Sequence, residues 1–289
     1  MEPPDEADCC NSGCNPCILD VYEAQLRKYQ KLGREKSGAV NALNPTSYTV
    51  FVLTGRKKIN ESVFFYTFKY ADCRERQPNC LDYKPGQYFL LRGRDPQGEF
   101  TRAYTPIPVP QNASLEFTVL VRLYDTGRMS QLFKTMQVGG ETSWRGPYGE
   151  FAPDYAHKFL VFIAQGTGIA PLYALIRDIV VHNEECESFV KLFFCVRNCD
   201  DILLRDELYE LGSFWNFNYE VFCNNCDQNV AKYHETIHNK KMSFCDLENY
   251  VQGKLGQVQV MISGSETFGR EIKEIIDRLG IESSHVYVF

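Results

Sequence analysis

The segment KFLVFIAQGTGIAPLYALIRDIVV, residues 158–181, decides the fold class of the second half of the chain. It opens with an apolar run at residues 158–164, passes through a turn containing Gly166 and Gly168, and ends in a helical pattern. A continuous apolar run is typical of a strand buried on both faces, as in a parallel sheet. The segment therefore predicts the strand–turn–helix unit of a doubly wound α/β domain.

The rest of the second half repeats this alternation. Apolar strand patterns occur at residues 189–196, 218–222, 257–262 and 285–289, and helical patterns at residues 204–211 and 267–279. Strands that alternate with helices predict a parallel sheet with helices on both faces. We expect this domain to span residues 154–289.

The preceding part of the chain has a different pattern, in which short strands are separated by turns. Short segments rich in Val, Phe, Tyr and Thr are separated by turns such as Lys84-Pro85-Gly86, and one helical pattern lies at residues 129–136. The expected strands are residues 48–53, 62–70, 87–92, 115–124 and 141–145. This pattern predicts a β-barrel domain over residues 45–153.

Residues 1–44 form a separate N-terminal segment and linker. An acidic, Pro-rich start precedes four cysteines, a helical pattern at residues 18–32 and a polar turn at residues 36–45. The thiols of Cys9, Cys10, Cys14 and Cys17 could bind zinc or an iron–sulfur cluster. Their spacing is tighter than that of a zinc ribbon, and a redox-reactive Cys tail is the alternative.

Composition narrows the class of protein. The 289 residues carry 31 Lys and Arg against 37 Asp and Glu, a net charge of −6, which argues against a general nucleic-acid binder. The longest apolar run is far shorter than the roughly 20 residues of a membrane span, and the acidic start is unlike a signal peptide. We expect the eight cysteines outside the cluster to be reduced, buried thiols of a cytoplasmic protein.

Two motifs in the barrel region suggest phosphate and ring binding. In Arg102-Ala103-Tyr104-Thr105, Arg102 and Tyr104 share one face of an extended chain, so a guanidinium and an aromatic ring lie together. In Gly127-Arg128-Met129-Ser130, free N–H groups at a helix start favour an anion. The alternatives are an ordinary edge strand and a plain N-cap serine.

Two further motifs follow strands of the α/β domain. Gln165-Gly166-Thr167-Gly168-Ile169-Ala170-Pro171 joins a buried strand to a helix, and Ser263-Gly264-Ser265 does the same at a later strand. Such turns lie at the edge of the sheet where α/β proteins bind ligands, although the first is not a GxGxxG sequence. Structural turn glycines are the alternative. The chain ends in an aromatic residue, Phe289.

These motifs, taken together and in this order, resemble the NADH-cytochrome b5 reductase family within the ferredoxin-reductase-like flavoproteins. The likeness covers residues 47–289 and includes Arg145-Gly146-Pro147-Tyr148-Gly149 and Asp201-Ile202-Leu203-Leu204-Arg205. The N-terminal Cys segment is similar to an oxidoreductase-like motif and indicates the b5-reductase-like subgroup. The resemblance implies a FAD-binding barrel followed by a NAD-binding α/β domain.

The resemblance also implies roles for individual residues. Arg102 would meet the FAD pyrophosphate, Tyr104 would stack on the flavin, and Thr105 would hydrogen-bond near its N5 atom. Residues implied in binding FAD or the nicotinamide nucleotide are Ala103, Leu120, Arg122, Tyr124, Arg128, Met129, Ser130, Gly166, Thr167, Gly168, Ala170, Gly264 and Phe289. Ser263 stands where the family has a cysteine beside the nicotinamide, and Ala170 replaces a threonine. Thr105 and Ser263 are the candidate catalytic residues.

The implied activity is hydride transfer from NADH to FAD, followed by single-electron transfer to a haem protein resembling cytochrome b5. Asp227 could select NADH by binding the adenosine ribose of the cofactor, and NADPH is the alternative hydride donor. An iron–sulfur protein, a quinone or an oxygenase component are alternative acceptors. A second alternative, motivated by Ser263 and Ala170, is a catalytically weak nucleotide-binding module that works through its N-terminal cysteines. For the reductase, the expected location is the cytoplasm, with contact to membranes through its electron acceptor.

Overall fold

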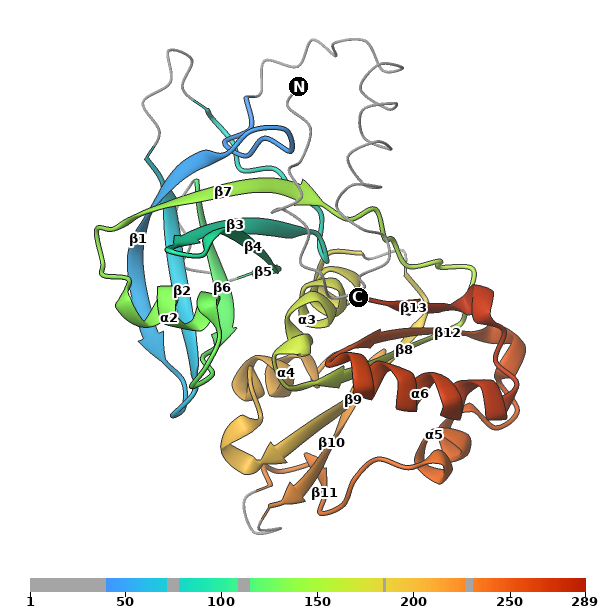
Figure 1. The fold of residues 1–289 in the computed structure, drawn as a ribbon. Helices are drawn as coiled ribbons and strands as arrows, with labels where there is room; N and C mark the ends of the chain where they lie inside the picture. The colour runs from blue at the N-terminus through green and yellow to red at the C-terminus, as the bar shows by residue number, and fades with distance from the viewer. Residues whose placement is uncertain (1–39, 72–77, 109–114, 184–185, 227–230) are drawn as a thin grey trace. The chain divides into compact units, whose positions relative to one another are not determined.

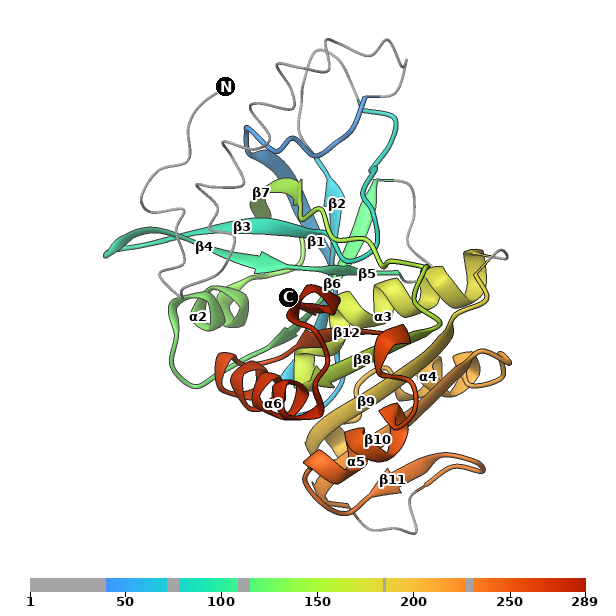
Figure 2. The same ribbon diagram turned by 90° about the vertical axis from the view of Figure 1, so that its right-hand side faces the viewer.

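The computed structural model describes residues 40–71, 78–108, 115–183, 186–226 and 231–289. The chain divides into two compact units, Met1–Phe151 and Ala152–Phe289, each with its own sheet. Figures 1 and 2 show the helices and strands of both units. In the described part of the chain, no helix is long and apolar enough to cross a membrane.

The first unit is built on a seven-stranded antiparallel sheet of order β4-β3-β7-β1-β2-β6-β5. Its elements are β1 (Thr49–Lys58), β2 (Val63–Tyr70), β3 (Tyr88–Asp95), β4 (Gly98–Tyr104), β5 (Pro106–Ile107), β6 (Glu116–Arg122), α2 (Arg128–Thr135) and β7 (Glu141–Tyr148). The outermost strands β4 and β5 are separated in the chain by Thr105 alone. The sheet must therefore curl round so that its two ends meet, which is the barrel that the sequence predicts.

Large apolar side chains fill the inside of this curled sheet. Phe51, Phe68, Phe89, Phe117 and Trp144 are fully buried, and several of their rings meet edge to face. Edge-to-face contacts between such rings add to the stabilisation from apolar burial. Two residues of the expected linker, Ala42 and Leu43, are also buried in this core.

The second unit contains a six-stranded parallel sheet of order β11-β10-β9-β8-β12-β13. Its elements are β8 (Phe159–Gln165), α3 (Ile169–Arg177), β9 (Phe189–Asn198), α4 (Arg205–Leu211), β10 (Phe217–Asn225), β11 (Thr236–His238), α5 (Phe244–Val251), β12 (Val258–Ser263), α6 (Glu266–Leu279) and β13 (Val286–Val288). Short 3-10 turns, η2 (Gly166–Gly168) and η4 (Cys199–Asp201), follow β8 and β9.

The central strand β8 is buried on both faces. Alternate residues Val161 and Ile163 belong to a core cluster with Leu247 of α5 and Ile272 of α6. The residues between them, such as Phe162, are also fully buried. Burial on both faces explains why the β8 sequence is continuously apolar instead of alternating.

The expectation that eight cysteines outside the N-terminal cluster are reduced and buried is wrong. Cys199 and Cys226 are joined by a disulfide, with their Cα atoms 5.2 Å apart. Cys245 is exposed, and Cys80 and Cys195 are only half-buried. The disulfide forms because β9 and β10 are parallel neighbours, so the segments that follow them meet at one edge of the sheet. Cys73 lies outside the described residues.

Candidate functional site

The junction between β4 and β5 presents a guanidinium and a ring. The strand pairing sets Tyr104 opposite Phe89 and Arg102 opposite Leu91, both core residues, so Arg102 and Tyr104 share a face as predicted. The Tyr104 ring packs 5.4 Å from the ring of Phe133 on α2, whereas Arg102 is exposed. Burial raises the pKa of Tyr104, which outweighs the nearby Arg102 charge, so the phenol remains a hydrogen-bond donor at neutral pH.

Hydrogen bonds hold the segment after β6 against α2. The backbone N–H of Tyr124 donates to Ser130 Oγ at 3.0 Å, and Lys134 Nζ donates to the Tyr124 carbonyl at 2.8 Å. The Tyr124 side chain nevertheless remains 61% exposed. A rigid backbone that holds an exposed ring beside a helix start offers a flat surface on which a planar ligand can stack.

The start of α2 is capped differently from the expectation. The N-cap is Gly127, with φ of 117°, and no side chain caps the helix. The alternative of a plain N-cap serine is therefore wrong, because Ser130 lies inside the first turn, where its hydroxyl holds Tyr124. The first N–H groups of a helix have no intrahelical acceptors and favour a negative charge.

The side chains of Arg128 and Met129 make contacts within the protein. Arg128 Nε and Nη2 donate to the two Asp95 carboxylate oxygens at 2.5 and 2.6 Å, and Nη2 also donates to the Gly98 carbonyl at 2.7 Å. The Arg128 guanidinium holds the pKa of Asp95 below its usual value, chiefly through this hydrogen bond. Met129 is buried in the core. These two residues thus offer a ligand their backbone N–H groups.

The other expected residues of this unit surround the same strand ends. Arg122 is half-buried, and its Nη1 donates to Ser62 Oγ at 3.4 Å. Leu120 is buried, Ala103 is exposed, and Thr105 is half-buried between β4 and β5. The structure therefore brings Tyr104, Tyr124 and Ser130 to α2, and it places Arg102 and Thr105 at the end of β4. An exposed guanidinium, an open helix start and an exposed ring are the donor set that a FAD diphosphate and its flat ring systems require.

In the second unit, the turn after β8 allows close approach to the backbone. Gly166 has φ of 54°, in the region that favours glycine, and a Cβ there would meet nothing within 4 Å. Gly168 lies against another strand end, because a Cβ on it would fall 2.6 Å from the Ser263 carbonyl oxygen. Thr167 is half-buried beside them, and Ala170 is buried in α3. One glycine thus leaves room for a ligand and the other permits packing.

The turn after β12 meets the turn after β8. Ser263 is buried at the end of β12, and Gly264 lies so close to the Gln165 side chain that a Cβ would be 2.8 Å from Gln165 Cβ. The Phe289 N–H donates to the Ile262 carbonyl at 2.9 Å, so the half-buried Phe289 lies beside the same strand end. The expected Gly166–Gly168, Ser263, Gly264 and Phe289 therefore gather at one edge of the sheet.

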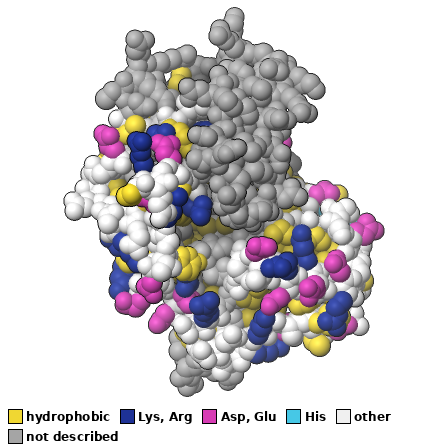
Figure 3. Space-filling model, viewed as in Figure 1, with side chains coloured by type: hydrophobic (Ala, Val, Ile, Leu, Met, Phe, Trp, Pro, Cys, Tyr) yellow, Lys and Arg dark blue, Asp and Glu magenta, His cyan; other side chains and the backbone are white. Residues whose placement is uncertain are grey.

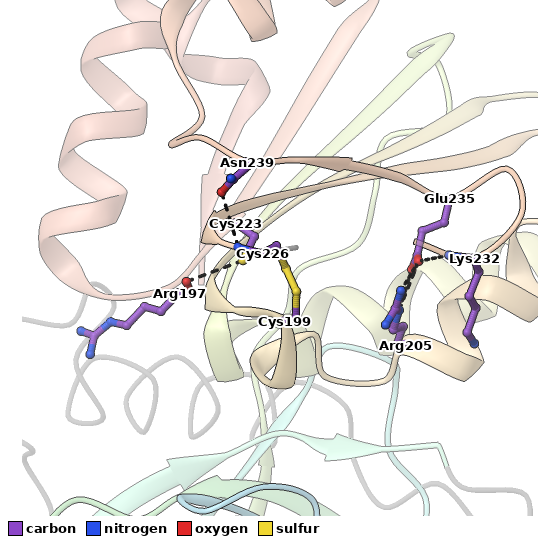
Figure 4. Close-up of a disulfide and its surroundings, with 8 residues drawn as sticks. All are labelled: Arg197, Cys199, Arg205, Cys223, Cys226, Lys232, Glu235 and Asn239. Carbon is purple, nitrogen blue, oxygen red and sulfur yellow. Dashed lines mark hydrogen bonds and ion pairs between the residues drawn. A yellow bond between two sulfur atoms is a disulfide. The ribbon is translucent and has the colours of Figure 1, made fainter. Parts of the chain in front are cut away.

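Two features of this unit were not predicted. Ser265 caps α6 and donates its hydroxyl to Gln165 Oε1 at 2.8 Å, which joins the two turns. Arg205, the last residue of the motif at 201–205, pairs with the buried Glu235 (Figure 4). Glu235 also accepts a hydrogen bond from the Tyr219 hydroxyl at 3.0 Å. Burial raises the pKa of Glu235, but the hydrogen bonds from Arg205, Lys232 N–H and Tyr219 outweigh it, so its pKa is lowered.

Some expected residues cannot be placed. Cys9, Cys10, Cys14 and Cys17 lie outside the described residues, as do the helical pattern at 18–32 and Asp227. On the face shown in Figure 3, acidic and basic side chains are interspersed over the described surface.

The family "Oxidoreductase FAD-binding domain" matches residues 50–152, and the family "Oxidoreductase NAD-binding domain" matches residues 162–274. The N-terminal family "Oxidoreductase-like protein" matches residues 1–37. The FAD family thus matches the first unit and the NAD family matches the second.

Two curated relatives are both named "NADH-cytochrome b5 reductase-like". The Homo sapiens protein is 29% identical over 301 residues, which cover 99% of this chain and 93% of the relative. The Mus musculus protein is 31% identical over 227 residues, 74% of this chain and 70% of the relative.

Solved structures show the same fold. The cytochrome b5 reductase domain of Ulva prolifera nitrate reductase superposes with a TM-score of 0.72 at 20% identity, covering 86% of this chain and 100% of that one. The CS-b5R domains of human Ncb5or superpose with a TM-score of 0.69 at 19% identity, covering 89% of this chain and 71% of that one. At these identities the likeness establishes the ferredoxin-reductase-like arrangement of an antiparallel and a parallel sheet.

Proposed function

The chain belongs to the NADH-cytochrome b5 reductase-like family, and from this premise we propose that it oxidises NADH and reduces a haem protein resembling cytochrome b5. The chain is a FAD- and NAD-binding oxidoreductase. The observation that carries the proposal is the site on the first unit, where exposed Arg102, the start of α2 and the exposed Tyr124 ring offer charge, N–H groups and a stacking face.

We assign the diphosphate of FAD to Arg102 and to the first N–H groups of α2, because the Arg128 guanidinium is held by Asp95. Tyr104 and Thr105 would lie along the flavin, and Tyr124 and Arg122 would complete the site from β6. Leu120 and Ala103 would shape its walls. When bound, FAD supplies the redox chemistry, since it accepts a hydride and releases electrons singly.

The second unit would bind the nicotinamide nucleotide at the turns after β8 and β12. Gly166, Thr167 and Gly168 would face its phosphates and ring, with Ala170 behind them in α3 and Gly264 and Phe289 at the neighbouring strand end. Ser263 is the candidate positioning hydroxyl where the family has a thiol. We expect NADH to be preferred, with Asp227 as the residue that would read the ribose.

The proposed organisation follows from the same premise. Residues 1–44 would form the Cys-rich segment and linker, residues 45–153 the FAD domain and residues 154–289 the NAD domain. The protein would act in the cytoplasm and would reach membranes only through its acceptor. Cys9, Cys10, Cys14 and Cys17 are candidate ligands of a metal or cluster in the first segment.

The acceptor can be identified by stopped-flow reoxidation. The protein is reduced with NADH without oxygen and mixed with a soluble cytochrome b5, a [2Fe–2S] ferredoxin, a benzoquinone or an unrelated dye. The proposal expects the b5 haem to be reduced faster than the dye under saturating conditions. A rate no faster than the dye would overturn the proposed acceptor, and a faster ferredoxin or quinone would identify the alternative.

A further inference from the structure

Three sulfur atoms converge beyond the carboxyl ends of two neighbouring strands. Cys199 begins η4 after β9, Cys223 lies near the end of β10, and Cys226 follows β10. Their Sγ atoms all lie within 4.8 Å of one another (Figure 4). Cys223 and Cys226 are buried, and Cys199 is half-buried. The disulfide joins Cys199 and Cys226, and it does not account for the position of the third sulfur, that of Cys223.

The strand pairing and a set of backbone contacts hold this cluster. Cys223 pairs with Val196 in the parallel ladder, and its Sγ donates to the Arg197 carbonyl at 3.6 Å. The Cys226 N–H donates to the Asn239 side chain at 3.4 Å. Sheet hydrogen bonds and a side-chain contact thus fix the three sulfurs on two adjacent segments before any ligand binds.

The arrangement has the chemistry of a soft-metal site. Cys223 and Cys226 are separated by two residues, the spacing of a Cys pair in zinc sites, and Cys199 supplies a third sulfur from the neighbouring segment. A zinc ion about 2.3 Å from each thiolate requires sulfurs roughly 3.8 Å apart, within the span observed. We propose that Cys199, Cys223 and Cys226 form a zinc site in the reduced chain, with the fourth position open to water.

The disulfide and the metal site are alternative states of the same atoms. A thiol reductant splits the Cys199–Cys226 bond: the reductant is oxidised to its disulfide, and two electrons and two protons go to the cysteine sulfurs. Zinc then displaces the protons of three thiols, because thiolates are the ligands. In the disulfide state only Cys223 can supply a thiolate, so the oxidised chain binds no zinc at this place.

The test uses the full chain with its bound FAD and removes the other Cys cluster. A variant with Cys9→Ser, Cys10→Ser, Cys14→Ser and Cys17→Ser is reduced with a phosphine, freed of reductant and titrated with Co²⁺ without oxygen. We expect one tightly bound Co²⁺ per chain, with tetrahedral absorption at wavelengths beyond the flavin bands. Added Zn²⁺ should displace it, and the unreduced protein should give no such band.

Two further variants assign the ligands. In the same background, Cys223→Ser should weaken Co²⁺ binding at least tenfold, whereas Cys245→Ser, which changes an exposed cysteine outside the cluster, should bind as before. Circular dichroism and flavin content establish that each variant is folded, and Cys199→Ser serves as a second ligand variant. The absence of a cobalt band in the reduced protein, or equal binding by the Cys223→Ser and Cys245→Ser variants, would overturn the proposal.

Discussion

Gln165 and Ser265 are 100 residues apart in the chain, yet they join the turns after β8 and β12. Gln165 Oε1 accepts the Ser265 hydroxyl at 2.8 Å and the Ser265 backbone N–H at 3.3 Å. Ser265 also caps α6 by accepting the Phe268 N–H at 3.3 Å. One amide oxygen thus fixes the relative position of the two turns that we assign to the nicotinamide nucleotide.

Replacement of Gln165 by Ala should weaken NADH binding without loss of FAD. A lost hydrogen bond is worth about 0.5–1.5 kcal/mol, so the KM for NADH should rise roughly twofold to tenfold. The measurement is steady-state reduction of ferricyanide by NADH, with flavin content recorded in parallel. Gln257→Ala, an exposed glutamine before β12, is the control. An unchanged KM in Gln165→Ala would show that the link does not position the nucleotide.

Replacement of Arg102 by Ala should weaken FAD retention. A charge-assisted hydrogen bond is worth about 1.5–3 kcal/mol, so the dissociation constant should rise roughly tenfold to a hundredfold. Dialysis followed by titration of the apoprotein with FAD measures it. Arg94→Ala removes an exposed arginine from β3 and should retain FAD. If both variants hold FAD equally well, Arg102 does not bind the diphosphate.

Gly168→Ala tests the close contact between the two turns. The φ of Gly168 is −61°, so the backbone tolerates alanine, but the added Cβ would lie 2.6 Å from the Ser263 carbonyl oxygen. Overpacking of this kind costs about 1–3 kcal/mol, and we expect a lower free energy of unfolding and a raised KM for NADH. Gly256→Ala, where a Cβ meets nothing within 4 Å, should leave both unchanged. Urea unfolding and NADH kinetics provide the comparison.

The Glu235 ion pair predicts a dependence of stability on pH. Its pKa is lowered in the folded state from the ordinary 4.5, so its contribution is complete above that value and declines as pH falls through the lowered pKa. Glu235→Gln leaves the half-buried Arg205 charge without its partner carboxylate and should cost about 1–3 kcal/mol at pH 7. Urea unfolding should show the difference from wild type shrinking below about pH 4.5.

The control for this variant is Glu248→Gln, which changes an exposed carboxylate on α5. It should remain within about 0.5 kcal/mol of wild type at every pH. A Glu235→Gln variant whose stability deficit is constant between pH 7 and the acid range would contradict the assigned pair.

The sequence predicted those strands and helices whose own residues show a clear apolar pattern. Strand β8 was predicted because it is almost continuously apolar, β9 because apolar residues dominate it despite Lys191, and α6 because its apolar residues recur at helical spacing. Strand β11 was missed because three residues carry no period. Helix α5 was also missed, although Ser243 and Asp246 form a capping box that signals its start.

The contacts that complete the site depend on distant pairs. Arg128 was expected to bind phosphate, and no local sequence signal reveals that Asp95, 33 residues earlier, holds its guanidinium. The Cys199–Cys226 disulfide spans 27 residues and exists only because β9 and β10 are neighbours. Strand order decides such pairs, and a single sequence does not specify strand order.

The absorption spectrum of the purified full-length protein tests the central claim most directly. We predict two flavin bands in the visible range that bleach when NADH is added without oxygen and return when air is admitted. A protein that holds no flavin after gentle purification and takes up none from added FAD would contradict the account. So would bound flavin that neither NADH nor NADPH bleaches.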